Sequence, residues 1–160
     1  MRKKIFVTVG SAYPFDRLVR ACDDAAARHP EHDWLAQIHE GTYEPTHMRF
    51  ERLMDKQAFD TAMTEADLVV GHAGMGTISG ALALDKPLLV LPRLRRFGES
   101  VNDHQVSCAR HFRSGGHLLA ADDAGDVGPL LERLPTFVPA PRRVRAAQLA
   151  DDIGTFLQSC

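Results

Sequence analysis

Residues 67–77, Asp-Leu-Val-Val-Gly-His-Ala-Gly-Met-Gly-Thr, decide the fold of this chain. A short apolar run, Leu68–Val70, ends in a glycine-rich turn, and a helical pattern opens directly behind the turn at Thr77. This order is typical of parallel-sheet proteins, in which glycines let the backbone approach a bound anion. The first N–H groups of the following helix have no partner within the helix and carry about half a positive charge. The stretch therefore predicts an anion site between a strand and a helix.

Length and composition narrow the class of protein. The 160 residues suit a single domain with a substantial core. The formal net charge of −2 and the low aromatic content of 7 % argue against nucleic acid as a partner, because few side chains can stack on bases. No apolar run reaches the roughly 18 residues of a membrane span. The three cysteines form no paired motif, so we expect reduced thiols and a cytoplasmic protein.

Short apolar and β-branched runs alternate with helical patterns along the chain. The predicted strands are 5–9, 34–39, 48–53, 68–70, 87–91 and 117–120. The predicted helices are 15–29, 58–66, 77–84, 102–113 and 127–134. This alternation predicts an α/β fold, a single Rossmann-like, doubly wound parallel sheet with right-handed crossovers. Ligands bind beyond the carboxyl ends of such strands, where residues 10–11, 72–77 and 93–102 would meet.

The C-terminal part of the chain differs from the rest. Residues 1–134 are expected to form the α/β domain, and residues 135–160 a Pro-rich connection followed by an amphipathic helix from about Arg142. An apolar stripe at helical spacing runs along that helix and consists of Leu149, Ile153, Phe156 and Leu157. The helix either folds back onto its own domain or docks a partner, and the sequence leaves both interpretations open.

The glycines of the turn limit the ligand. Residues 74–80 read GxGxxxG rather than the GxGxxG of a dinucleotide fold, and no acidic residue ends the next strand to bind a ribose. A GK[ST] pattern is absent as well. What remains is a diphosphate held by backbone amides, with Thr77 as a hydroxyl donor. Alternatively, Gly74 and Gly76 only make a tight strand-to-helix connection, and the glycines alone do not separate these interpretations.

Several further segments, taken in order with the turn, carry a family resemblance. They are Phe-Val-Thr-Val-Gly at 6–10, Pro-Phe-Asp-Arg-Leu-Val at 14–19, the stretch 66–77, Lys-Pro-Leu-Leu-Val-Leu-Pro at 86–92 and Asn-Asp-His-Gln at 102–105. From Lys3 to about Ala121 the chain resembles the C-terminal, donor-binding domain of glycosyltransferase family 28. Similar single-domain subunits occur in the dolichol-linked N-acetylglucosaminyltransferase and in bacterial exopolysaccharide glycosyltransferases of the glucuronosyltransferase type.

The resemblance implies a division of labour between two proteins. The domain at 1–134 would be the C-terminal half of a GT-B glycosyltransferase and would bind a UDP-sugar without a cofactor. A separate membrane-anchored subunit would hold a lipid-linked saccharide acceptor and recruit this chain to the inner face of the membrane. The expected reaction moves a hexosyl group by direct displacement, with inversion and without a metal. A nucleotide-sugar-binding module without transferase activity is the alternative, whereas a free-standing epimerase would need two domains.

The resemblance also implies which positions contact the donor. They are Gly10 and Ser11 near the phosphates and sugar, Leu53 and Met54 at the uracil edge, His72, Ala73, Gly74, Met75, Gly76 and Thr77 around the diphosphate, and Asn102, Asp103 and Gln105 at the donor sugar. The expected catalytic residues are His72, Gly76 and Thr77, since amides and a helix dipole would stabilise the charge of the leaving group. His72 either donates to that group or serves as a structural hydrogen-bonder.

One position departs from the family pattern. Relatives usually carry a glutamate early in the helix behind the turn, where it binds the ribose hydroxyls, whereas this chain has Gly80. Either Ser79 or a water molecule substitutes, or the nucleotide binds more weakly or differently.

Two further groups of residues have a possible function. His104, Cys108 and His111 share one face of a predicted helix, which resembles a set of metal ligands, but no fourth ligand is evident, and we favour a partly buried polar face. Arginines at 93, 95 and 96 follow the fifth predicted strand and could reach a diphosphate, a uronate or anionic lipid. We favour a solvated loop for them.

Overall fold

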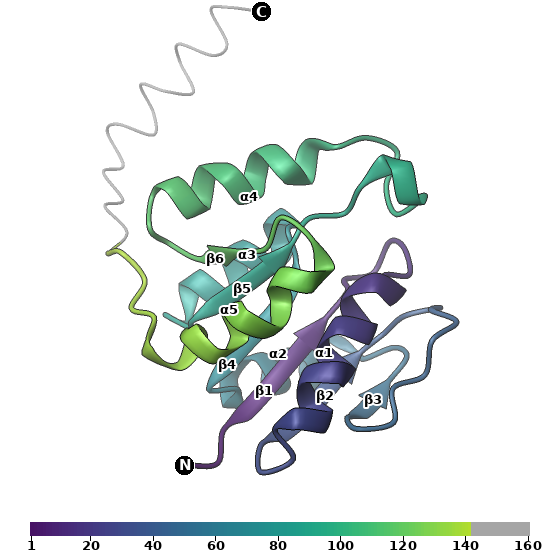
Figure 1. The fold of residues 1–160 in the computed structure, drawn as a ribbon, viewed down its shortest axis with the longest axis vertical. Coiled ribbons are helices and arrows are strands. Elements are labelled where there is room, and N and C mark those ends of the chain that lie inside the picture. Colours follow the sequence, from purple (N-terminus) through teal and green to yellow (C-terminus); the bar gives the residue numbers. More distant parts are fainter. Residues whose placement is uncertain (142–160) are drawn as a thin grey trace, which may run out of the picture.

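The computed structural model describes residues 1–141, which form a six-stranded parallel sheet with helices on both faces (Figure 1). The strands are β1 (Lys4–Thr8), β2 (Asp33–Gln37), β3 (Arg49–Glu51), β4 (Leu68–His72), β5 (Leu88–Leu91) and β6 (Leu119–Ala120). Their order is β3-β2-β1-β4-β5-β6, and every neighbouring pair is parallel. The predicted α/β class and all six predicted strands are thereby confirmed.

The helices also agree with the predictions. They are α1 (Asp16–Arg28), α2 (Lys56–Glu65), α3 (Met75–Ala83), α4 (His104–Ser114) and α5 (Val127–Arg133), with short 3₁₀ helices η1 (Arg95–Phe97), η2 (Ala124–Asp126) and η3 (Leu134–Thr136). The first prediction began one residue early, because Phe15 is the N-cap of α1 and is fully buried. None of the described helices has the length and apolar character that a bilayer span requires. The predicted helix from Arg142 lies outside the described residues.

Alternation along the central strands builds two cores, one on each face of the sheet. In β1, the side chains of Ile5 and Val7 join the core under α1 and α5, whereas Phe6 joins the core under α2, α3 and α4. In β4, the side chain of Val70 joins the core under α1 and α5, and that of Val69 joins the core on the other face. A strand covered on both faces must be apolar at every position, which explains the continuous hydrophobic runs in the sequence.

The chain order creates a reversal point in the middle of the sheet. The path runs outward from β1 through β2 to β3 and then crosses to β4 on the other side of β1. Thr8 at the end of β1 is paired in register with Gly71 near the end of β4. The two connections that leave these strands run to opposite sides, so a crevice forms above their carboxyl ends.

Two cysteines fall within the described residues, and both are free thiols. Cys22 is buried in α1, where desolvation raises the pKa of its thiol well above the usual value, so it is a packing residue rather than a nucleophile. Cys108 is partly buried in α4.

Candidate functional site

A cavity of about 680 Å³ opens at the carboxyl ends of the strands, beside the reversal point between β1 and β4. Its walls come from the loop after β1, the segment after β3, the turn between β4 and α3, and the segment around the start of α4. The sequence-predicted residues that line it are Gly10, Ser11, Leu53, Met54, His72, Gly74, Met75, Gly76, Thr77 and Gln105. The other three predicted residues, Ala73, Asn102 and Asp103, are not among the described residues of the lining.

The start of α3 presents free backbone donors at this cavity. Gly74 is the N-cap, with extended backbone angles (φ −83°, ψ 143°) and no side-chain cap. The amide of Ile78 donates to the carbonyl of Gly74 at 3.0 Å and closes the first helical turn. The amides of Met75, Gly76 and Thr77 therefore have no carbonyl to reach within the helix. Together with the helix dipole, they form an anion-binding group.

The glycines of the turn have different structural roles. A Cβ on Gly74 would lie 2.2 Å from Nε2 of His72, so this glycine is needed for packing. A Cβ on Gly76 would have no heavy atom within 4 Å, so nothing in the described structure requires this glycine for packing. The tight-connection interpretation therefore holds for Gly74 but does not account for Gly76, which leaves open space beside the helix amides.

His72 is confined at the end of β4. Its ring also lies close to Gly10, where a Cβ would come within 2.6 Å of Cε1 of His72. Burial, assisted by the nearby positive charge of Arg93, lowers the pKa of His72 to about 4. The imidazole is therefore neutral at physiological pH and can donate at most one hydrogen bond to a ligand.

Thr77 directs its hydroxyl toward this histidine. The side chain is 5 % exposed, and its Oγ1 lies 3.4 Å from Nδ1 of His72. Its methyl carbon Cγ2 lies so close to Gly71 that a Cβ there would be only 2.8 Å away. The glycine in β4 thus makes room for the threonine, so that His72 and Thr77 lie together as a partly buried pair beneath the helix start.

Gln105 ties the ends of two strands together. Its Oε1 accepts hydrogen bonds from the amides of Ala73 and Arg93, both at 3.1 Å. The amide of Ala73 is consequently engaged inside the protein, and Ala73 itself is fully buried. Within residues 1–141, the Nε2 group of Gln105 has no hydrogen-bond acceptor, so this cavity-lining amide can donate to a ligand.

Asn102 and Asp103 hold the chain before α4 in place. The Oδ1 atom of Asn102 accepts from the backbone amide of His104 at 3.2 Å and from the Nδ1 atom of the same residue. The Oδ1 atom of Asp103 accepts from the amide of Arg95 at 2.8 Å. Both side chains are exposed, and of these residues only His104 lines the cavity.

The cavity lining also contains residues that were not predicted to contact the donor. They include Gln37, Lys56, Phe59, Ser100, Val101 and His104. Gln37 is a buried polar residue at the end of β2, and its Nε2 donates to the carbonyl of Gly10 at 3.0 Å. A polar side chain at the carboxyl end of an otherwise apolar strand was the signal that would have identified it.

The burial of Arg93 contradicts one interpretation of the sequence. The favoured solvated-loop interpretation is wrong for Arg93, which is only 2 % exposed, although it holds for the exposed Arg95 and Arg96. Arg93 directly continues the buried run of β5, and its guanidinium bonds backbone carbonyls rather than solvent. Burial lowers the pKa of Arg93 to about 10, so the side chain stays charged at neutral pH.

The charges around the cavity favour an anion. Its described lining contains the cations Lys56 and Arg93 and no carboxylate. Hard divalent cations need oxygen ligands, usually carboxylates, so this lining is better suited to phosphate than to a metal ion. In residues 1–141, no three His, Cys, Asp or Glu side chains are arranged to hold a metal, and His104, Cys108 and His111 are no exception.

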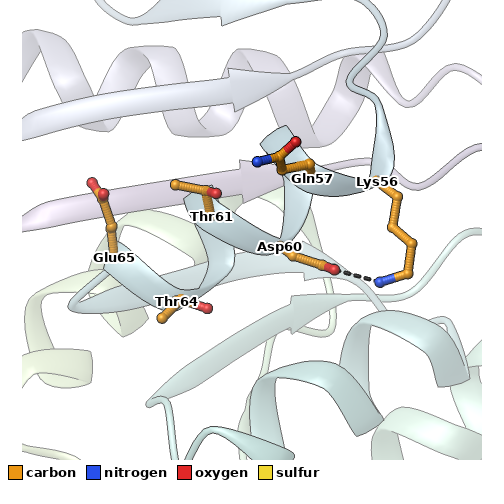
Figure 2. A pocket seen from close by; sticks show the side chains of 6 residues that line it. All are labelled: Lys56, Gln57, Asp60, Thr61, Thr64 and Glu65. Carbon is orange, nitrogen blue, oxygen red and sulfur yellow. Dashed lines mark hydrogen bonds and ion pairs between the residues drawn. The ribbon is translucent and has the colours of Figure 1, made fainter.

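A second hollow, of about 560 Å³, runs along the outside of α2 (Figure 2). Its side chains all come from one helix: Lys56, Gln57, Asp60, Thr61, Thr64 and Glu65. Lys56 forms an ion pair with Asp60, and Glu65 adds another negative charge. This hollow has no turn amides in its lining, so the cavity at the strand ends is the better candidate.

Comparison with known proteins agrees with this geometry. Residues 4–122 match the glycosyltransferase family 28 C-terminal domain. The chain is 31 % identical over 127 residues to the UDP-N-acetylglucosamine transferase subunit ALG13 of Mus musculus, covering 73 % of this chain and 10 % of that protein. It is 37 % identical over 97 residues to the subunit of the same name from Eremothecium gossypii, covering 57 % of this chain and 45 % of that protein. The chain thus spans less than half the length of either relative.

Solved structures share the fold. The glycotransferase of kitacinnamycin superimposes with a TM-score of 0.64 at 19 % identity, covering 84 % of this chain and 35 % of that one. MurG of Acinetobacter baumannii superimposes with a TM-score of 0.62 at 17 % identity, covering 86 % and 43 %. The sheet has the architecture of the C-terminal half of GT-B enzymes. With the sequence match over residues 4–122, the chain belongs to the family of glycosyltransferase family 28 C-terminal domains.

Proposed function

We propose that this chain is the donor-binding half of a glycosyltransferase that transfers a hexosyl group from a UDP-sugar. The observation that carries the proposal is the uncapped start of α3, whose amides at Met75, Gly76 and Thr77 face a cavity without a described carboxylate. The donor diphosphate would accept hydrogen bonds from these amides. Uridine is the proposed nucleoside because the ALG13 relatives are named as UDP-N-acetylglucosamine transferase subunits.

The rest of the donor would extend across the cavity. Its volume of about 680 Å³ suits a ligand of nucleotide-sugar size. The uracil edge would meet the backbone at Leu53 and Met54, and the sugar would accept from the Nε2 amide of Gln105. Near the ribose, Gly80 leaves open space, and Ser79 is exposed with its Oγ bonded to the carbonyl of Gly76 at 3.3 Å. Either Ser79 or water would then contact the ribose hydroxyls.

The proposed chemistry is displacement at the anomeric carbon with inversion. The acceptor hydroxyl forms the new C–O bond as the bond to the UDP oxygen breaks, and the negative charge moves onto the leaving diphosphate. The hydroxyl proton would pass to a general base, which we place on the subunit that binds the acceptor. The amides at Met75–Thr77 and the helix dipole would stabilise that charge, and loss of one such donor typically costs about 10²–10³ in rate. We infer that no metal takes this role, because the described lining offers no carboxylate to hold one.

A separate subunit is proposed to cover the cavity. The exposed side chains at its rim include Tyr13 (43 % exposed), Leu53 (68 %), Met75 (52 %) and Val101 (72 %), which is an unusual gathering of large apolar groups on a surface. A second domain that holds a lipid-linked acceptor would bury them and exclude water from the reaction. The proposed enzyme is thus a heteromeric complex, with this chain in the cytoplasm and recruited to the inner face of the membrane by its membrane-anchored partner.

A calorimetric titration against UDP-, GDP- and dTDP-sugars tests the donor. Saturable binding of UDP-sugars, with weak or no binding of the others, is expected. In the Gly76→Val variant the added side chain would fill the space beside the helix amides and weaken binding at least tenfold. Gly125→Val is the matched control, because a Cβ on Gly125 also meets nothing within 4 Å and Gly125 does not line the cavity. Unchanged affinity in Gly76→Val would refute the proposal.

A binding module without transferase activity is the second candidate. Gly80, at the position where the family usually has a glutamate, favours this alternative. The two candidates differ in turnover: an enzyme half releases UDP when it is mixed with its acceptor-binding subunit and a lipid-linked acceptor, whereas a binding module does not.

A further inference from the structure

Arg93 is a buried cation in the lining of the cavity, and within residues 1–141 no carboxylate forms an ion pair with it. Arg93 lies just beyond β5, after Pro92. Its guanidinium donates to backbone carbonyls of the loop after β1: Nη2 to Tyr13 at 2.6 Å and Nη1 to Pro14 at 2.8 Å. Nη2 also donates to the carbonyl of Val9 at the other end of that loop. The arginine is separated from these partners by about 80 positions in the sequence, so the contacts are purely tertiary.

The loop at residues 9–14 is held at both ends by side chains from other parts of the chain. Residues 11–14 are exposed and belong to no helix or strand, yet Gly10, Ser11 and Tyr13 form one wall of the cavity. The loop begins with Gly10 in the left-handed region, at φ 76°, where Gln37 holds its carbonyl. Within the described residues, the far end at Tyr13 and Pro14 is held by Arg93.

The guanidinium is itself held from two sides. Its plane lies over the ring of Phe15, with Cζ 4.7 Å from the ring centroid, and Nη1 also donates to the carbonyl of Glu99 at 3.3 Å. The carboxylate of Glu99 forms a two-pronged ion pair with Arg17, with both N–O distances at 2.9 Å. It also accepts from the amide of Leu94 at 2.9 Å. The Arg93 guanidinium thus meets four backbone carbonyls at once, those of Val9, Tyr13, Pro14 and Glu99. This needs the rigid, planar fork of an arginine, which a lysine ammonium does not have.

We propose that Arg93 is a positioning residue, which fixes the loop at residues 9–14 in the shape that receives the donor. It does so through the carbonyls of Val9, Tyr13 and Pro14 and without contacting the donor itself. The proposal rests on the proposed function, because it assigns the loop to donor binding. Both Nη groups of Arg93 already bond backbone carbonyls, so neither is left to bind a charged sugar.

The test compares Arg93→Lys and Arg93→Gln with Arg95→Lys. Lysine keeps the charge and loses the fork, glutamine keeps two donors and loses the charge, and Arg95 is the exposed control two residues away. For each protein we would measure the melting temperature, the affinity for UDP by calorimetry, and hydrogen exchange of the amides of residues 10–13 without ligand. Folding is verified first by circular dichroism at a temperature well below the melting transition.

We expect both Arg93 variants to fold, to exchange the loop amides at least tenfold faster, and to bind UDP at least tenfold more weakly. Arg95→Lys should match the wild type in all three measurements. Folded Arg93 variants with wild-type loop exchange or wild-type UDP affinity would overturn the inference, as would failure of both variants to fold, because Arg93 would then serve stability alone. Failure of the wild type to bind UDP would overturn the proposed function instead, and with it the assignment of this loop to the donor.

Discussion

The ring of His72 occupies the space that a side chain on Gly74 would need, since a Cβ there would lie 2.2 Å from Nε2. Gly10 confines the same ring, so the imidazole has little room to move aside. The histidine at the end of β4 and the glycine that caps α3 are therefore a matched pair. The pair positions the start of α3, and with it the amides that face the cavity.

Gly74→Ala should therefore destabilise the protein. The methyl group would force the ring or the turn to shift, which typically costs about 1–3 kcal/mol in a packed site. Urea unfolding measures this difference in the free energy of unfolding. Gly80→Ala is the control within the same helix: a Cβ on Gly80 meets nothing within 4 Å, and alanine should stabilise the helix by about 0.5–1 kcal/mol. Equal stability of the two variants would contradict the packing argument.

His72 should also make stability depend on pH. Burial lowers the pKa of His72 from 6.5 to about 4, so the folded state favours the neutral ring. The stability that the neutral His72 ring contributes is fully present above the pKa of histidine in the unfolded chain. It is lost as the pH falls from about 6.5 toward 4. At most about 3.5 kcal/mol would be lost, at about 1.4 kcal/mol per pKa unit.

The measurement is urea unfolding at pH 7 and at pH 4.5 for the wild type and for His72→Gln. The loss of stability on acidification should be smaller in His72→Gln than in the wild type. An identical pH dependence in the wild type and His72→Gln would exclude this assignment.

A glutamate at position 80 should strengthen nucleotide binding. Gly80 has open space around its Cα, so Gly80→Glu is accommodated in α3. Hydrogen bonds from ribose hydroxyls to a carboxylate contribute about 1.5–3 kcal/mol, which corresponds to roughly tenfold or more in affinity. Calorimetry with UDP should show the gain, and 2′-deoxy-UDP should show less of it. An equal gain for both nucleotides would mean that the new carboxylate does not reach the 2′-hydroxyl.

The apolar rim predicts where the partner binds. Val101→Asp places a charge in a surface that the proposed subunit would desolvate, so capture of the co-expressed partner should fall at least tenfold. Val138→Asp is the control, because Val138 is 84 % exposed and does not line the cavity. Co-purification and gel filtration measure the complex. Undiminished capture by Val101→Asp would place the interface elsewhere.

Local patterns predicted the elements and the place of the cavity, because both follow from short-range periodicity and from the topology of parallel sheets. The turn at residues 72–77 is read directly from glycines and an apolar run, and most of the predicted contacts line the cavity. The role of Arg93 depends on carbonyls about 80 positions away, which no local pattern encodes. In the same way, Asn102 looks like a ligand-binding amide in sequence, but in the structure its Oδ1 caps the amide of His104.

The two outer strands of the sheet are very short, with three residues in β3 and two in β6. Few main-chain groups are therefore left at either border for an incoming polypeptide to pair with, which disfavours sheet extension and edge-to-edge aggregation. A protein that associates with this domain along the edge of the described sheet finds few unpaired backbone groups for hydrogen bonds. At the sheet edges a partner would therefore contact side chains more than backbone, so substitutions there can alter its binding while the sheet stays intact.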